Sequence, residues 1–261
     1  MHKQDNKITR ISFGIAFSII TTMVIVFLYD FYFHLELYKF GILPRHLSGL
    51  LGVLTSPFIH STDNYSHILN NSIPMFVLTW LLFHTYRTVA SKVFIFIYLF
   101  TGLVVWLLGR ETYHIGMSGV IYGLTSFLIV SGFFRKNMRV AGISLLVIFL
   151  YGSIIWGVIP LDPSISWEGH FFGFLSGMIM AGVFRNSGPQ PAKYRYEVEE
   201  DLGFEYAEEF WLDKPTVDIS DIQEEVVDIE PDLSNQYEPF KINYVYVPSI
   251  IERVDGIEEE E

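Results

Sequence analysis

Two glycine-rich motifs in this sequence each contain one side chain that could take part in acyl transfer. Ser118 lies in Gly-Met-Ser-Gly at residues 116–119, and His170 lies in Gly-His-Phe-Phe-Gly at residues 169–173. A hydroxyl within hydrogen-bond reach of an imidazole is the nucleophile and base that acyl transfer needs. A serine at the start of a helix also lies beside N–H groups that can stabilise an oxyanion. Together the motifs predict a catalytic Ser118–His170 dyad.

A third polar cluster could supply donors to the same reaction. His67 and Asn71 are four residues apart, so they share one face of a helix. Both side chains can donate hydrogen bonds toward a tetrahedral oxyanion. The same pair could instead cap a helix at the membrane interface. No acid accompanies Ser118 and His170 in the apolar segments, so we predict a dyad rather than a triad.

The glycines also allow an interpretation in which the motifs only pack helices together. Small residues recur every fourth position, at Gly119 and Gly123 in the first motif and at Gly169, Gly173, Gly177 and Ala181 in the second. This spacing lets two membrane helices approach closely. Taken alone, Ser118 could be a packing residue and His170 a histidine hydrogen-bonded at the interface. Taken together, two closely packed helices would bring hydroxyl and imidazole to a similar depth.

The motifs lie at the beginnings of long apolar segments. Residues 11–29 contain no charge, and a helix of this length crosses a bilayer core of about 30 Å. Similar segments follow at residues 67–85, 92–108, 117–134, 140–159 and 168–184. Buried helices of a soluble protein would carry polar faces, which these segments almost lack. We therefore expect an all-α membrane protein with six transmembrane helices over residues 11–185.

Charge separates this bundle from the end of the chain. Residues 1–185 hold seven acidic and twelve basic residues, whereas residues 186–261 hold 22 acidic and five basic residues. We expect residues 186–261 to form an acidic, mostly disordered tail. Lys and Arg collect in the loops on the side of the two termini, and such loops face the cytoplasm. We therefore expect residues 1–10 and the tail to be cytoplasmic, in an integral protein of a bacterial inner membrane.

The order of the motifs resembles the rhomboid family of intramembrane serine proteases. H-x-x-x-N at residues 67–71, G-x-S-G at 116–119 with Tyr122 four residues after the serine, and G-H-x-x-G-x-x-x-G at 169–177 lie on the second, fourth and sixth spans. The resemblance covers about residues 11–185 and implies a rhomboid-like bundle. It implies cleavage of single-span membrane proteins near the outer membrane surface. The implied partners are transmembrane protein substrates and the lipid bilayer, with no cofactor, metal or nucleic acid.

The resemblance also implies a role for each site residue. Ser118 would attack the scissile carbonyl, and His170 would take its proton and later protonate the leaving amine. His67, Asn71 and the Ser118 N–H would form the oxyanion hole. Four residues would support them by making room for the substrate, packing the helices or holding the imidazole: Gly116, Gly119, Tyr122 and Gly173. The Trp-Arg dipeptide of many rhomboid first loops is missing, and His60 falls where some members carry a further histidine.

Other functions fit the sequence less well. The main alternative is a catalytically inactive rhomboid-like protein that binds or sorts transmembrane clients, but such proteins usually lack the serine or the histidine, and both are present. A transporter or channel would show paired broken helices or acids within its spans. A zinc protease would carry H-E-x-x-H, which is absent. No basic patch indicates nucleic-acid binding.

Overall fold

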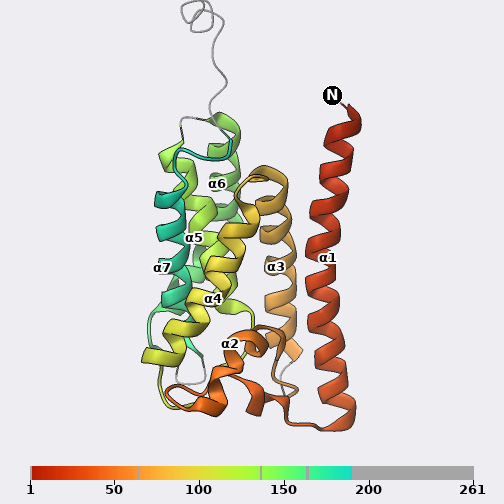
Figure 1. The fold of residues 1–261 in the computed structure, drawn as a ribbon, viewed down its shortest axis with the longest axis vertical. Coiled ribbons are helices and arrows are strands. Elements are labelled where there is room, and N and C mark those ends of the chain that lie inside the picture. Colours follow the sequence, from red (N-terminus) through yellow and green to blue (C-terminus); the bar gives the residue numbers. More distant parts are fainter. Residues whose placement is uncertain (1, 64, 136, 163–164, 190–261) are drawn as a thin grey trace, which may run out of the picture. The chain divides into compact units, whose positions relative to one another are not determined.

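Helices account for most of the described structure (Figure 1). The computed structural model describes residues 2–63, 65–135, 137–162 and 165–189, so most of the predicted acidic tail lies outside the described residues. The α-helices of the described part are α1 (His2–Phe33), α2 (Gly52–Thr55), α3 (Tyr65–Thr85), α4 (Ala90–Leu108), α5 (Ser118–Phe134), α6 (Met138–Tyr151) and α7 (Trp167–Val183). The expected all-α architecture is confirmed for this part of the chain.

Among the described residues, two helical segments are long and apolar enough to cross a membrane by themselves, namely Asn6–Phe33 and Ala90–Leu108, and α5 and α6 are shorter apolar helices. Large apolar side chains on the outside of the bundle are exposed, such as Phe17 on α1 and Leu145 and Phe149 on α6. Such a surface is unfavourable in water, whereas it suits contact with lipid chains.

One helix differs from the expectation. The sequence predicts a single helix over residues 140–159, whereas α6 ends at Tyr151 and Gly152–Val158 form a 3-10 segment, η4. Gly152 is the C-cap of α6, and glycine is a poor helix former because it loses much backbone entropy on folding. The tighter winding of η4 changes where its carbonyls lie, and the carbonyl of Gly157 becomes an acceptor in the site described below.

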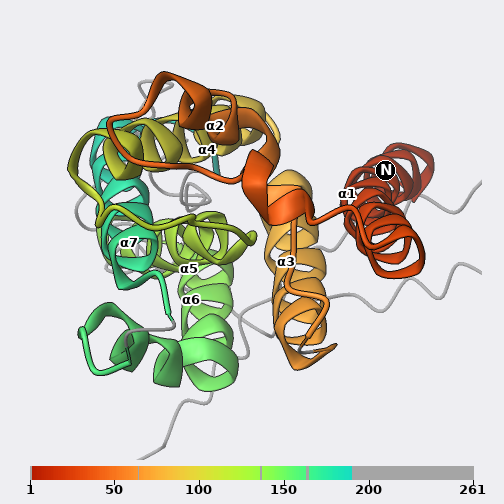
Figure 2. The same cartoon turned by 90° about the horizontal axis from the view of Figure 1, so that it is seen from below.

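α5 lies at the centre of the bundle, where it contacts α3, α4, α6 and α7 (Figure 2). α1 packs against α3 instead. The approach of α7 to α5 is very close. A Cβ atom added to Gly173 would lie 2.0 Å from the carbonyl oxygen of Gly119, and one added to Gly177 would lie 1.9 Å from that of Gly123. The small-residue motifs therefore pack these two helices backbone against backbone.

α3, α5 and α7 all begin at the end of the bundle that lies opposite the N-terminus (Figure 1). Between the two ends lies an apolar core whose fully buried side chains include Met23, Met75, Leu78, Leu82, Ile97, Leu124, Phe127 and Leu128. Close packing of this kind fixes the helix starts relative to one another. Ser118 is the first residue of α5 and His170 lies in the first turn of α7, so both lie at the same end.

The segment between α1 and α3 covers this end of the bundle with short helical turns. The 3-10 turns η1 (Leu37–Phe40), η2 (Leu47–Leu50) and η3 (Ser56–Phe58) flank the single turn α2. The carbonyl of Ser56 accepts a hydrogen bond from the N–H of Gly116 at 2.9 Å. The segment is thereby tied to the loop that leads into α5.

Candidate active site

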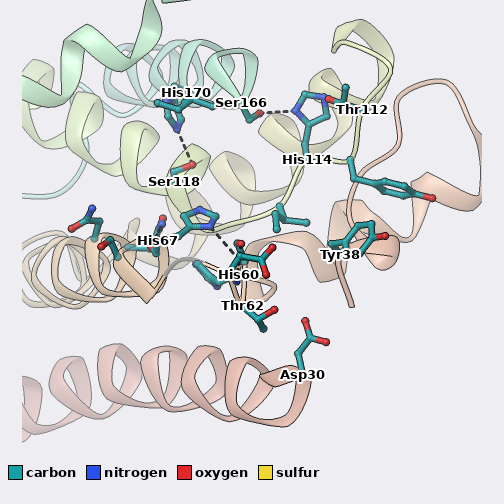
Figure 3. A pocket seen from close by; sticks show the side chains of 18 of the residues that line it. Asp30, Tyr38, His60, Thr62, His67, Thr112, His114, Ser118, Ser166 and His170 are labelled. Carbon is teal, nitrogen blue, oxygen red and sulfur yellow. Dashed lines mark hydrogen bonds between the residues drawn. The ribbon is translucent and has the colours of Figure 1, made fainter. Parts of the chain in front are cut away.

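Ser118 and His170 lie within one hydrogen bond of each other (Figure 3). Nε2 of His170 is 2.8 Å from Oγ of Ser118. This distance lies in the range of about 2.6–3.2 Å over which a general base can take a proton. Because Ser118 is the first residue of α5, its N–H lacks an acceptor within the helix and lies at the positive end of the helix dipole.

Two contacts fix the orientation of the His170 ring. Nδ1 lies 2.9 Å from the carbonyl oxygen of Gly157. A carbonyl only accepts, so the ring proton is on Nδ1, and Nε2 keeps a lone pair for the hydroxyl of Ser118. The ring also stacks on Tyr122, with 4.1 Å between centroids and 8° between planes. A backbone carbonyl thus takes the orienting position that an acid occupies in a catalytic triad.

His67 and Asn71 on α3 line the same cavity as the dyad. The N–H of Ser61 donates to Nδ1 of His67 at 3.4 Å, which leaves the proton of the neutral ring on Nε2. Nδ2 of Asn71 donates to the carbonyl oxygen of His67 at 2.7 Å. An amide nitrogen has two N–H groups, so Asn71 keeps one for another acceptor. Both side chains can therefore donate into the cavity beside Ser118.

Gly116 brings the chain into α5 by a turn that favours glycine. Its φ is 103°, a conformation that residues with a Cβ rarely adopt. A Cβ atom there would lie 2.8 Å from Nε2 of His67. The space in front of Gly116 is therefore taken by the His67 ring, whereas the family resemblance assigns it to the substrate backbone. Close contact with Gly116 keeps the His67 ring beside the start of α5.

A cavity of about 920 Å³ opens in front of the dyad, lined among others by Asp30, His60, His67, Asn71, Ser118 and His170. This volume suits a ligand as large as a short peptide segment. Burial, reinforced by the neighbouring His67 imidazole, lowers the pKa of His60 to about 4. His60 is therefore neutral at neutral pH. The described residues contain no cluster of three or more metal-ligating side chains.

Sequence reasoning missed a polar network next to His170. Arg110 binds the carboxylate of Glu168 through Nε and Nη2, at 2.6 and 3.1 Å. Nδ1 of His114 lies 2.6 Å from Oγ of Ser166 (Figure 3). Glu168 lies inside the last predicted span, so the inference that no acid accompanies the dyad is wrong, although this acid binds Arg110. An acid within an apolar segment is the signal that points to the network.

Comparison with known proteins gives a consistent result. A family model described as a rhomboid domain matches residues 47–187, which include the dyad, His67 and Asn71. An uncharacterized protein of Mycobacterium tuberculosis is 37% identical over 153 residues, covering 54% of this chain and 62% of the relative. An uncharacterized protein of Mycobacterium leprae is 31% identical over 177 residues, covering 63% and 69%. The chain thus spans less than two thirds of the length of the M. tuberculosis relative.

Proposed function

The chain belongs to the rhomboid family, and from this premise we propose that it is an intramembrane serine endopeptidase. It cuts single-span membrane proteins near the outer membrane surface, with Ser118 as nucleophile and His170 as general base. The observation that carries the proposal is the 2.8 Å contact between Nε2 of His170 and Oγ of Ser118. Ser118 and His170 also line a cavity that suits a peptide. This location gives the contact more weight than a serine beside a histidine on an open surface would have.

His170 can act as the base in acylation because its ring carries its proton on Nδ1 and leaves Nε2 free to accept one. As Oγ of Ser118 attacks the scissile carbonyl carbon, its proton moves to Nε2 of His170, while Nδ1–H stays on the carbonyl of Gly157. The oxyanion is stabilised by the Ser118 N–H, by Nε2–H of His67 and by Nδ2–H of Asn71. When the C–N bond breaks, the proton on His170 passes to the leaving amine. The acyl chain stays behind as an ester on Ser118.

Hydrolysis of the ester returns the site to its starting state. Water attacks the ester carbonyl while Nε2 of His170 takes its proton, and His170 then gives the proton to Oγ of Ser118 as the new acid leaves. The carbonyl of Gly157 carries no full charge, so it stabilises the imidazolium less than a carboxylate would. We therefore expect formation and hydrolysis of the Ser118 ester to be slower than in an enzyme with a full triad.

We also propose that α1, α3, α4, α5, α6 with η4, and α7 cross the inner membrane, with residues 1–10 and the tail from residue 186 in the cytoplasm. The Lys and Arg residues of the loops support this orientation. Because the chain has no cysteine, Leu161→Cys and Ser187→Cys give a clean test. An impermeant maleimide added to intact cells should label only the Leu161→Cys variant, and the opposite pattern would reverse the topology.

Cleavage of a reporter single-span protein by the purified protein in liposomes tests the proposal. Ser118→Ala and His170→Ala should each abolish the cut and leave helix content and the unfolding midpoint near those of the wild type. The double variant should be no worse than either single one, because the two residues act as a unit. Cleavage by Ser118→Ala at the wild-type rate would contradict the mechanism. A wild-type protein that binds the reporter without cutting it would favour the inactive client-binding alternative.

A further inference from the structure

We infer that the ion pair between Arg110 and Glu168 sets the position of His170 against Ser118, so that Arg110 and Glu168 are positioning residues for the cleavage reaction. This inference rests on the proposed function. Arg110 lies in the loop that leads into α5, and Glu168 lies in the first turn of α7, two residues before His170. The pair therefore joins the loop that precedes Ser118 to the helix that carries His170.

The pair has a well-defined geometry. Nε of Arg110 lies 2.6 Å from Oε1 of Glu168, and Nη2 lies 3.1 Å from Oε2. The backbone N–H of Arg110 also donates to Oε1, at 3.2 Å. Only 2% of Glu168 is exposed. A two-pronged contact of a planar guanidinium with a carboxylate fixes orientation as well as distance, so the start of α7 cannot rotate or slide without breaking it.

A second tie runs parallel to the ion pair. Nε2 of His114 lies 3.0 Å from the carbonyl oxygen of Arg110, so Nε2 donates and Nδ1 accepts from the hydroxyl of Ser166 at 2.6 Å. Burial lowers the pKa of His114, which favours the neutral ring. Ser166 is the N-cap of α7 and accepts the N–H of Gly169 at 3.4 Å. The loop thus holds α7 at its cap and in its first turn.

The α5–α7 contact explains why such ties are needed. Glycine faces let the two backbones touch, and one side-chain hydrogen bond crosses the contact, from the hydroxyl of Ser126 on α5 to the carbonyl of Phe174 on α7 at 2.7 Å. The glycines themselves carry no side chains that would interlock at the end of α7 that holds His170. The loop is itself held on its far side, because His114 and Ile42 exchange backbone hydrogen bonds at 2.8 and 3.0 Å. The ties from the loop therefore add to the α5–α7 contact at the end of α7 that carries His170.

The chemistry of the pair fits a positional role better than a stabilising one. Glu168 is buried whereas 36% of the Arg110 side chain is exposed, so solvent screens the guanidinium and desolvation of the carboxylate offsets much of the attraction, which leaves little net stability. Apolar side chains would hold the loop to α7 at least as firmly, but they would tolerate small shifts. An orientation-dependent contact near a reacting pair is useful because a displacement of about 1 Å can cost about 100-fold in rate.

The test is the rate at which a fluorophosphonate modifies Ser118, measured per folded molecule and separated into the maximal rate and the apparent affinity. Glu168→Gln should lower the maximal rate by about 10- to 100-fold and leave the apparent affinity within about twofold. Arg110→Lys keeps the charge but loses the two-pronged guanidinium contact, and it should give a smaller loss in the maximal rate. The matched control is Glu111→Gln in the same loop, which removes an exposed contact with His46 and should leave the rate unchanged.

The outcomes separate this inference from the proposed function. Absence of modification at Ser118 in the wild type would refute the proposed function itself. Modification of the wild type, Glu168→Gln and Arg110→Lys at equal maximal rates would overturn the inference alone. Loss of the folded state in both variants would also overturn it, because the pair would then serve folding rather than position.

Discussion

α7 and α1 are both apolar helices on the outside of the bundle, but they are attached in different ways. α7 meets α5 through glycines, with Gly173 against the backbone of Gly119. α1 meets α3 through aromatic side chains, among them Phe13, whose ring lies edge-on to that of Phe76 with 5.3 Å between centroids. Gly14 on α1 has open space around its α-carbon.

The α5–α7 and α1–α3 contacts differ in how far they can adjust. Backbone atoms have no rotamers, so a contact between backbones fixes the distance between two helices and leaves no room for an added atom. Contacts between side chains can adjust by rotamer changes. The dyad lies across the first kind of contact. We therefore expect changes at α5–α7 to affect catalysis and changes at α1–α3 to affect only stability.

α3 packs against α1, but its Asn71 also lines the cavity beside the dyad, and a change there should give the largest effect. Asn71→Ala removes one of the proposed oxyanion donors and should lower kcat by about 10²- to 10³-fold. The unfolding midpoint should stay near that of the wild type, because the substitution removes the hydrogen bond from Nδ2 of Asn71 to the carbonyl of His67 but also removes Oδ1, a buried acceptor without a partner among the described residues. Cleavage kinetics and thermal unfolding of the same preparation check this. A loss of stability with kcat unchanged would make Asn71 a packing residue.

Gly173→Ala should break the α5–α7 contact. The added Cβ would lie 2.0 Å from a backbone oxygen that cannot move aside, so we expect a loss of about 2–3 kcal/mol in the free energy of unfolding together with a large loss of cleavage. Gly182→Ala in the same helix meets nothing within 4 Å and should be neutral or stabilising by up to about 1 kcal/mol. Equal effects of the two substitutions on unfolding would disprove close packing as the cause.

His60 should make stability depend on pH. A folded-state pKa of about 4, below the unfolded value of about 6.5, favours the neutral ring, so its contribution is complete above pH 6.5 and is lost as the pH falls toward 4. At about pH 5 the loss should amount to about 2 kcal/mol. His60→Gln should reduce the change in unfolding free energy between pH 8 and pH 5 without abolishing it, because burial also lowers the pKa of His114. His34→Asn, at an exposed histidine, should follow the wild-type curve.

Phe13→Leu should give the smallest effect. It removes the edge-to-face contact with Phe76 and should cost about 1 kcal/mol of stability, with the cleavage rate per folded molecule unchanged. Thermal unfolding and single-turnover cleavage measure the two quantities separately. A loss of cleavage comparable to that of Gly173→Ala would abolish the distinction between the two helix contacts.

The helices and the meeting of Ser118 with His170 could be predicted because they depend on local patterns: apolar length, small residues at every fourth position, and a polar residue at a helix start. The acceptor that orients His170 could not be predicted. It is the backbone carbonyl of Gly157, and a carbonyl is present at every residue. Its position depends on the change from α-helix to 3-10 winding after Tyr151, which apolar periodicity does not reveal.

The loop network shows a second limit of local patterns. Arg110 and Glu168 are far apart in the sequence, and only the tertiary fold pairs them. Glu168 nonetheless gave a signal, because an acid within an apolar segment needs a partner. The position of His67 against Gly116 is likewise a tertiary contact.

The central claim is that Ser118 is a nucleophile activated by His170, and mapping a covalent adduct tests it most directly. The purified protein is incubated with a fluorophosphonate, and the modified peptide is identified by mass spectrometry. We predict one adduct, on Ser118, in the wild type and none in Ser118→Ala or His170→Ala. An unmodified wild-type protein, or an adduct that persists in Ser118→Ala, would contradict the claim.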